Sequence, residues 1–176
     1  MNWDAPERGG LLFEKLCRAA TEIRAGNPEI APRLEAMTAL LWGAFAPMHC
    51  SWVGFYCVAA ETTSDSLILA CCRPKPACSP IGLHGVCGQA FVEGVVRIVE
   101  DVSLLGNAYV ACDPRDRSEL VVPIFVGGRP AGVLDLDSIQ LACFDAHDAD
   151  RIAKILESAG LLDRSLKLRI DRLPIP

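Results

Sequence analysis

The stretch SELVVPIFVGGRPAGVLDLDS, residues 118–138, decides the fold class of this chain. Its two halves consist mainly of β-branched and apolar residues, and the GGRP between them is typical of a turn. We therefore predict two antiparallel strands joined as a hairpin. Asp135 and Asp137 share one face of the second strand, and Glu119 begins the first strand. Spacing alone favours an ordinary solvated face, but pairing of the two strands would place all three acids around one pocket.

The segments around this hairpin carry further strand and helix signals. Strands are predicted for SWVGFYCVA, LILACCR and VVRIVE, and helices for residues 11–25, for Pro28 to about Ala46 and for FDAHDADRIAKILESAGLL with Asp145 as its N-cap. This order predicts one α+β domain over residues 1–176, in which an antiparallel sheet has helices packed on it. We expect N-terminal helices at about 11–46, a core at about 50–160 and a C-terminal helical extension.

Composition excludes several classes of function. Hydrophobic residues make up 51% and charged residues 22% of the 176, which is typical of a globular domain. The net charge is only −5 and the basic residues are scattered, so we expect neither a nucleic-acid nor a membrane partner. The N-terminus lacks the pattern of a secretory signal, and no apolar run approaches the roughly 18 residues of a membrane span. We expect a cytoplasmic protein.

The cysteines are unevenly distributed, because four of the nine fall within residues 71–88. Such a cluster could serve as a metal site, a disulfide or a set of reactive thiols. The nine are Cys17, Cys50, Cys57, Cys71, Cys72, Cys78, Cys87, Cys112 and Cys143. An odd number cannot pair completely, and persistent disulfides are rare in the cytosol. No pair has the C-x2–4-C spacing of a structural zinc site, so we predict no metal. Reactive thiols remain, beside cysteines that simply fill the core.

Three cysteines are candidates for that chemistry. Cys112 precedes Asp113-Pro114, where a helical turn would expose backbone N–H groups that favour a thiolate. Taken alone, a small buried apolar cysteine is the commoner interpretation. Cys78 and Cys87 flank a loop rich in glycine and proline, where reactive groups are common, and for these two the interpretations are evenly balanced.

Trp52 and Tyr56 are the candidate apolar wall of a ligand pocket. They lie four residues apart and therefore share a face of a regular strand. Two aromatic residues in a core are the usual outcome of such a pattern. The residues by themselves thus predict a thiol-containing cleft with acids and aromatics.

The motifs SWVGFY, PACSPI, GVCGQAF, ACDPRDRSELVVPI, GVLDLDS and FDAHDADRIAKIL together resemble the free methionine-(R)-sulfoxide reductases, which are stand-alone GAF-domain enzymes. The resemblance covers roughly residues 30 to 160. It implies reduction of free L-methionine (R)-sulfoxide, without a cofactor, by a cysteine thiolate that passes through a sulfenic acid and an intramolecular disulfide. Thioredoxin would be the recycling reductant, and the family suggests a homodimer.

The resemblance also implies roles for particular residues. Cys112, Cys78 and Cys87 match the three redox cysteines of the family, while Trp52, Tyr56, Glu119, Asp135 and Asp137 match its pocket positions. Which cysteine attacks and which resolves stays open. The remaining cysteines are expected to be packing residues.

One segment departs from the family. Residues 101–113, DVSLLGNAYVACD, carry Ser103 and Leu105 where histidine and proline are usual. Two alternatives to the enzyme stay open: a non-catalytic GAF module that binds a ligand, and a thiol redox sensor. The module predicts no dependence on Cys112, and the sensor predicts oxidation by peroxide with no preference for methionine sulfoxide.

Overall fold

The computed structural model describes residues 9–58, 65–108, 113–163 and 169–173. The α-helices are α1 (Gly9–Gly26), α2 (Ile30–Phe45), α3 (Val86–Glu93) and α4 (Ala146–Ser158), and the 3-10 helices are η1 (Ala46–Met48) and η2 (Val102–Ala108). The strands are β1 (Cys50–Cys57), β2 (Ser66–Arg73), β3 (Ile81–Gly82), β4 (Val95–Val99), β5 (Ser118–Val126), β6 (Arg129–Ser138) and β7 (Arg169–Leu173). The predicted helices and strands outside the C-terminal extension are confirmed.

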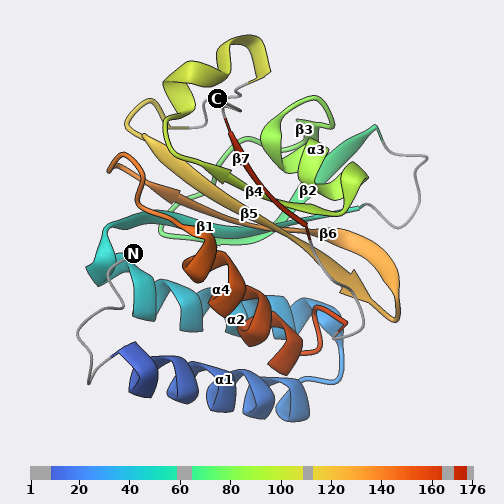
Figure 1. Cartoon of the computed structure of the whole chain (residues 1–176). Helices are drawn as coiled ribbons and strands as arrows, with labels where there is room; N and C mark the ends of the chain where they lie inside the picture. The colour runs from blue at the N-terminus through green and yellow to red at the C-terminus, as the bar shows by residue number, and fades with distance from the viewer. Residues whose placement is uncertain (1–8, 59–64, 109–112, 164–168, 174–176) are drawn as a thin grey trace.

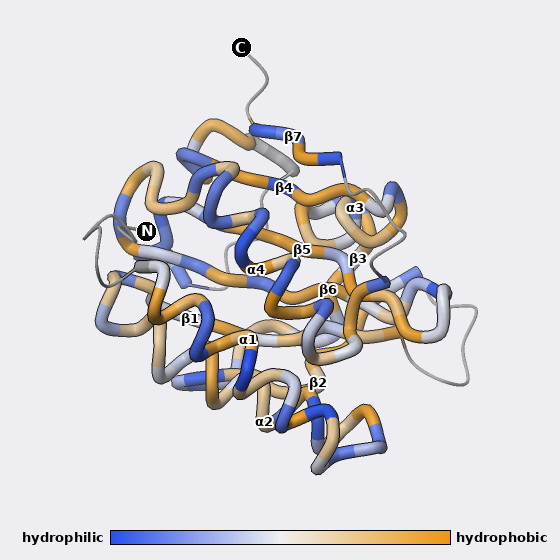
Figure 2. Tube along the Cα trace, turned by 60° about the horizontal axis from the view of Figure 1, so that its bottom comes forward, coloured by the Kyte–Doolittle hydropathy of each residue, from blue (hydrophilic) through white to orange (hydrophobic). Residues whose placement is uncertain are grey.

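The strands form one seven-stranded sheet in the order β3-β2-β1-β6-β5-β4-β7. The hairpin of residues 118–138 supplies β5 and β6, which pair antiparallel and lie near the centre of the sheet. Antiparallel pairing also joins β1 to β2, β1 to β6 and β4 to β5, as the sequence predicts. Figure 2 shows that hydrophobic residues follow these central strands.

Helices α1, α2 and α4 lie on one side of the sheet and α3 lies on the other (Figure 1). On the first face, α2 packs against β1 and β2, while α1 lies against α2 and α4. Side chains of α2 such as Leu41 and Phe45 are fully buried there with Phe55 of β1 and Leu134 of β6. This apolar layer is the main core. It leaves the opposite face of the same strands free to build a pocket.

The closing helix α4 begins at the predicted cap. The Asp145 side chain accepts hydrogen bonds from the backbone N–H groups of His147 and Asp148, at 2.7 and 2.9 Å. The Asp148 side chain in turn accepts from the Asp145 N–H at 2.9 Å, which completes a capping box. Such a cap stabilises a helix by about 1 kcal/mol, because it satisfies N–H groups that have no partner within the helix.

The prediction of a helical C-terminal extension is wrong for residues 169–173, which form β7. This strand pairs with β4 in parallel and makes the sheet mixed rather than wholly antiparallel. Arg97 of β4 is buried and forms ion pairs with Asp171 at 2.9 Å and with Glu93 at 2.7 Å. The backbone groups at the β4 edge, which would otherwise be unpaired, thus pair with a segment whose local sequence gave no clear strand signal.

Within the described ranges, no helix has the length and apolar character that crossing a membrane requires.

Candidate active site

Strand register places the three predicted acids on the face of the sheet opposite the main core. Asp137 of β6 lies between Trp52 of β1 and Glu119 of β5 in the pairing. Two residues away along β6, on the same face, Asp135 pairs with Gly54 of β1. The hairpin thus brings the three carboxylates into one pocket, as the sequence predicts. Glu119 and Asp135 are both buried, whereas Asp137 is partly exposed.

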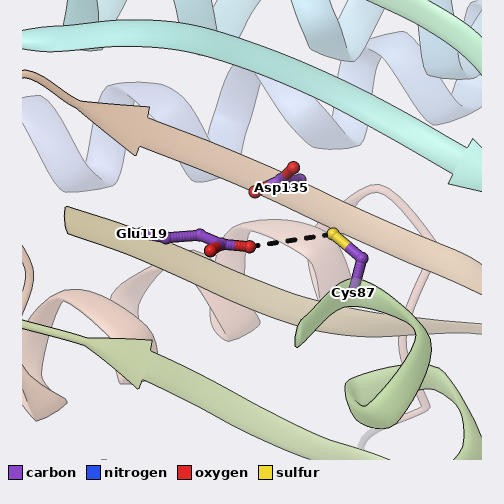
Figure 3. Close-up of side chains that lie close together, drawn as sticks. All are labelled: Cys87, Glu119 and Asp135. Carbon is purple, nitrogen blue, oxygen red and sulfur yellow. Dashed lines mark hydrogen bonds between the residues drawn. The ribbon is translucent and has the colours of Figure 1, made fainter. Parts of the chain in front are cut away.

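Helix α3 covers these acids and adds the thiol of Cys87. The helix begins after Gly85, so Cys87 lies in its first turn. Gly88 permits the close approach of this turn to the chain before it, since a Cβ there would lie 2.2 Å from the Leu83 Cα. Figure 3 shows Cys87 projecting from α3 toward the strands that carry Glu119 and Asp135.

The Cys87 thiol and two of the acids form a close group. Cys87 Sγ donates a long hydrogen bond of 3.9 Å to Glu119 Oε1. One ligand-type atom from each of Cys87, Glu119 and Asp135 lies within 4.8 Å of the other two. The buried Asp135 Oδ1 has no hydrogen-bond partner among the described residues. No lysine or arginine of the described ranges forms an ion pair with Glu119, Asp135 or Asp137.

Burial and mutual repulsion favour the protonated forms of these groups. Burial, followed by the charge of Asp137, raises the pKa of Glu119 well above its usual range. Burial and the neighbouring acids raise the pKa values of Asp135 and Asp137 in the same way. Burial also raises the pKa of the Cys87 thiol, with further contributions from Asp135 and Glu119. Their effect outweighs the helix N-terminus, which by itself favours a thiolate.

The predicted aromatic wall is present. The rings of Trp52 and Tyr56 stack with centroids 6.0 Å apart and an interplanar angle of 29°. Both are buried and line the pocket with Cys87 and the acids. Gly54 lies between them in sequence, and a Cβ there would be 2.1 Å from the Trp52 ring. Its lack of a side chain therefore allows the indole to lie flat over β1.

Polar atoms of the same aromatics hold the loop that carries Cys78. Trp52 Nε1 donates a 2.8 Å hydrogen bond to the Lys75 carbonyl, and the Tyr56 hydroxyl donates one of 2.9 Å to the Cys78 carbonyl. The Lys75 ammonium in turn forms a 2.7 Å ion pair with Asp113. Cys78 itself is exposed. This loop therefore contacts both the pocket wall and the segment that follows Cys112.

The structure brings together most of the predicted site residues. Cys87, Trp52, Tyr56, Glu119, Asp135 and Asp137 line one pocket, and Cys78 lies on the adjoining loop. Cys112 lies outside the described residues. Sequence reasoning missed Asp116, a buried acid that lines the same pocket and accepts a 2.9 Å hydrogen bond from Ser51. It also missed Gly54 and Lys75, which act through other residues and carry no motif of their own.

The remaining described cysteines serve as packing residues, as predicted. Cys50 and Cys143 are buried in the main core, and Cys17, Cys57 and Cys71 pack against it from partly buried positions. Cys72 packs on the opposite, pocket-side cluster. The adjacent Cys71 and Cys72 therefore point to opposite faces of β2. All eight described cysteines are free thiols.

Comparison with known proteins identifies the family. The family described as "GAF domain" matches residues 34–161. The free methionine-R-sulfoxide reductase of Escherichia coli is 31% identical over 147 residues, which covers 82% of this chain and 84% of that protein. The chain belongs to the GAF-domain family of free methionine-R-sulfoxide reductases.

Two further relatives of this GAF domain are a solved structure and a curated sequence. The free methionine-R-sulfoxide reductase of Neisseria meningitidis, solved in complex with its substrate, superposes with a TM-score of 0.75 at 36% identity, covering 84% of this chain and 86% of that one. Protein YtsP of Bacillus subtilis is 38% identical over 110 residues, or 61% of this chain, and the match spans 65% of the length of YtsP.

Proposed function

We propose that this GAF domain is an oxidoreductase that reduces free L-methionine (R)-sulfoxide to L-methionine. The observation that carries the proposal is the group of three carboxylates around a thiol, without a cation from the described residues. Such a group favours a small ligand that brings its own positive charge. The relatives from Escherichia coli and Neisseria meningitidis bear the name of this activity, and the latter was solved in complex with its substrate.

Preference for the free amino acid follows from the same acids. The α-ammonium group of free methionine sulfoxide can pair with buried carboxylates of the pocket, whereas the methyl sulfoxide end can lie against Trp52 and Tyr56. A peptide-linked methionine sulfoxide lacks that ammonium and would leave buried carboxylates unpaired. Loss of such a partner discriminates by roughly 10⁴ when a polar site is left unsatisfied.

In the proposed chemistry, the Cys112 thiolate attacks the sulfoxide sulfur. An acid of the pocket, Glu119 or Asp137, donates a proton to the oxygen. The raised pKa of both carboxyls supports this role, because a raised pKa keeps a proton available near neutral pH. The S–O oxygen passes to Cys112, which becomes a sulfenic acid, and methionine leaves. The sulfoxide is reduced by two electrons and the cysteine is oxidised by two.

Recycling then requires a second thiol and an external dithiol. We assign the second thiol to Cys78, which attacks the sulfenic sulfur of Cys112, forms a disulfide and releases water. Thioredoxin would reduce that disulfide by thiol exchange, and the exposure of Cys78 makes it accessible to such a partner. Cys87 is the alternative redox partner. Its raised pKa keeps it a thiol, which favours Cys112 as the attacking group.

The setting of the enzyme is part of the proposal. We place it in the cytoplasm, where reduced thioredoxin is available and most thiols stay reduced. A homodimer, as the family resemblance implies, remains a prediction that sedimentation of the purified protein would test.

The test combines the protein with thioredoxin, thioredoxin reductase and NADPH and adds each methionine sulfoxide diastereomer in turn. We expect NADPH consumption with the free R form, none with the S form, and none with the Cys112→Ser variant. Cys17→Ser, which changes a partly buried packing cysteine of α1, is the matched control and should keep full activity. Folded, reduced protein that consumes no NADPH with either diastereomer would refute the reductase and leave a ligand-binding or sensing GAF module.

A further inference from the structure

We propose that Cys87, Glu119 and Asp135 also form a binding site for a thiophilic divalent cation, of which Zn²⁺ and Cd²⁺ are examples. The three residues come from α3, β5 and β6. One ligand-type atom from each lies within 4.8 Å of the other two (Figure 3). No spacing motif in the sequence indicates this set. Glu119 lies 32 positions after Cys87 and 16 before Asp135, and the three meet only through packing of α3 on the sheet.

The separation of these atoms is close to what a metal ion requires. Zinc binds thiolate at about 2.3 Å and carboxylate oxygen at about 2.0–2.2 Å, so tetrahedral ligands lie roughly 3.5 Å apart. The three atoms must therefore move together by about an ångström. Rotation about the side-chain bonds of Glu119 and Cys87 provides that movement, since Cys87 already points toward Glu119 at 3.9 Å.

A second observation, independent of the clustering, points to a ligand. Asp135 Oδ1 is buried and has no hydrogen-bond partner among the described residues. The Asp135 residue as a whole is only 7% exposed. An unpaired buried carboxylate oxygen is costly, and such groups normally coordinate a cation or pair with one. No lysine or arginine of the described ranges forms an ion pair with Asp135, so a cation from solution is the natural partner.

The donor set selects the class of ion. Magnesium and calcium take six or more oxygen ligands, and a sulfur donor is foreign to both. A thiolate with two carboxylates instead suits zinc or cadmium, and the fourth position stays open to water or to the nearby Asp137. Metal binding would displace the Cys87 proton, because the thiolate is the ligand.

The consequence for the enzyme rests on the function proposed above. The cation and the substrate ammonium would compete for the same carboxylates, so the metal would inhibit reduction and substrate would release the metal. The thiol must be reduced to bind, so oxidation of Cys87 would also release the metal. The site would thus make activity sensitive to free zinc and to the redox state of one buried cysteine.

A cadmium titration of the reduced protein, without substrate, tests the site directly. Thiolate-to-cadmium charge transfer absorbs in the ultraviolet, and we expect the first equivalent of Cd²⁺ to produce this band in the wild type. The band for that equivalent should be lost in Cys87→Ser and unchanged in Cys78→Ser, which removes an exposed thiol of the neighbouring loop. In Asp135→Asn the affinity should fall at least about tenfold. Zn²⁺ competition against a chromophoric chelator measures the same affinities, and circular dichroism confirms that each variant is folded.

The outcomes separate this inference from the proposed function. A first equivalent that binds equally well to folded Cys87→Ser, or that requires Cys78, overturns the metal site. So does a wild type that binds no Cd²⁺. Reductase activity is measured separately in the presence of a chelator, and its absence would refute the proposed function while cadmium binding stands. Displacement of bound Cd²⁺ by free methionine (R)-sulfoxide, but not by the S form, is the result expected if both are correct.

Discussion

The Tyr56 hydroxyl donates a 2.9 Å hydrogen bond to the backbone carbonyl of Cys78. A side chain in the wall of the pocket therefore holds the backbone of the residue proposed to close the disulfide. Trp52 holds the same loop three residues earlier through the Lys75 carbonyl. The pocket and the recycling thiol are thus parts of one connected structure, and changes in one are expected to appear in the other.

Tyr56→Phe should slow recycling more than sulfoxide reduction. The substitution keeps the ring against the pocket and removes only the hydroxyl, so a hydrogen bond of about 0.5–1.5 kcal/mol is lost. We expect disulfide formation to slow roughly threefold to tenfold. Single-turnover measurements that follow methionine release and thiol loss separately would show this difference. Equal slowing of both steps would contradict a role in positioning Cys78.

Lys75→Gln tests the ion pair between the Cys78 loop and Asp113. The Lys75 side chain is half-exposed, so its loss should change the free energy of unfolding by no more than about 1 kcal/mol. We nevertheless expect slower disulfide formation, because the loop loses its contact with the residue after Cys112. High salt should slow the wild type in the same direction.

Lys154→Gln is the matched control for that experiment. Lys154 is exposed to the same degree as Lys75 and forms a 2.8 Å ion pair with Asp150 on α4, on the other side of the sheet from the pocket. Loss of the Lys154 charge should leave the rates of sulfoxide reduction and of disulfide formation unchanged. If Lys154→Gln slows recycling as much as Lys75→Gln does, the effect is one of overall charge.

Asp135→Asn should stabilise the fold and weaken substrate binding. Because the pKa of Asp135 is raised in the folded protein, its ionisation opposes folding: this cost is absent below the unfolded pKa near 4 and grows as the pH rises above that value. Because asparagine cannot ionise, the substitution removes this cost and should raise the free energy of unfolding at pH 8 by roughly 1–3 kcal/mol. Urea denaturation at pH 5 and pH 8 measures this, and the difference between variant and wild type should be smaller at pH 5. Asp150→Asn, which changes an exposed acid, should show no comparable gain.

Gly54→Ala should disturb the aromatic wall. The new Cβ would lie 2.1 Å from the Trp52 ring, so the indole must move and its hydrogen bond to the Lys75 carbonyl is strained. Overpacking of this kind costs about 1–3 kcal/mol, and we expect KM to rise by roughly tenfold or more with that displacement. The change in tryptophan fluorescence relative to the wild type and steady-state kinetics together measure the effect.

Gly43→Ala is the control, and it is expected to raise the stability that Gly54→Ala lowers. Gly43 lies inside α2, where a Cβ meets nothing within 4 Å. An alanine there should stabilise the protein by about 0.5–1 kcal/mol, because it reduces the conformational freedom of the unfolded chain. Activity should not change. A loss of activity in Gly43→Ala would show that the assay responds to substitutions far from the pocket.

Local patterns in the sequence were sufficient to predict most elements and part of the pocket. The hairpin of residues 118–138 was recognisable from its β-branched runs and its turn, and α4 from its apolar spacing and the Asp145 cap. Once those strands are paired, the period of two residues places Asp135 and Asp137 on the face away from the main core. These features depend on contacts between near neighbours in the chain, which a sequence displays directly.

Only the tertiary structure decided how the separate parts of the pocket meet. Packing of α3 on the sheet set Cys87 against Glu119 and Asp135, and the sequence spacing of these residues gave no sign of it. The parallel pairing of β7 with β4 was likewise missed, since the strand is stabilised by the distant Arg97 rather than by its own pattern. The sequence alone thus determined most of the elements and the faces of their side chains. The raised pKa of Cys87 and the pairing of β7 at the edge of the sheet arise from contacts between residues far apart in the chain. Such contacts exist only after folding.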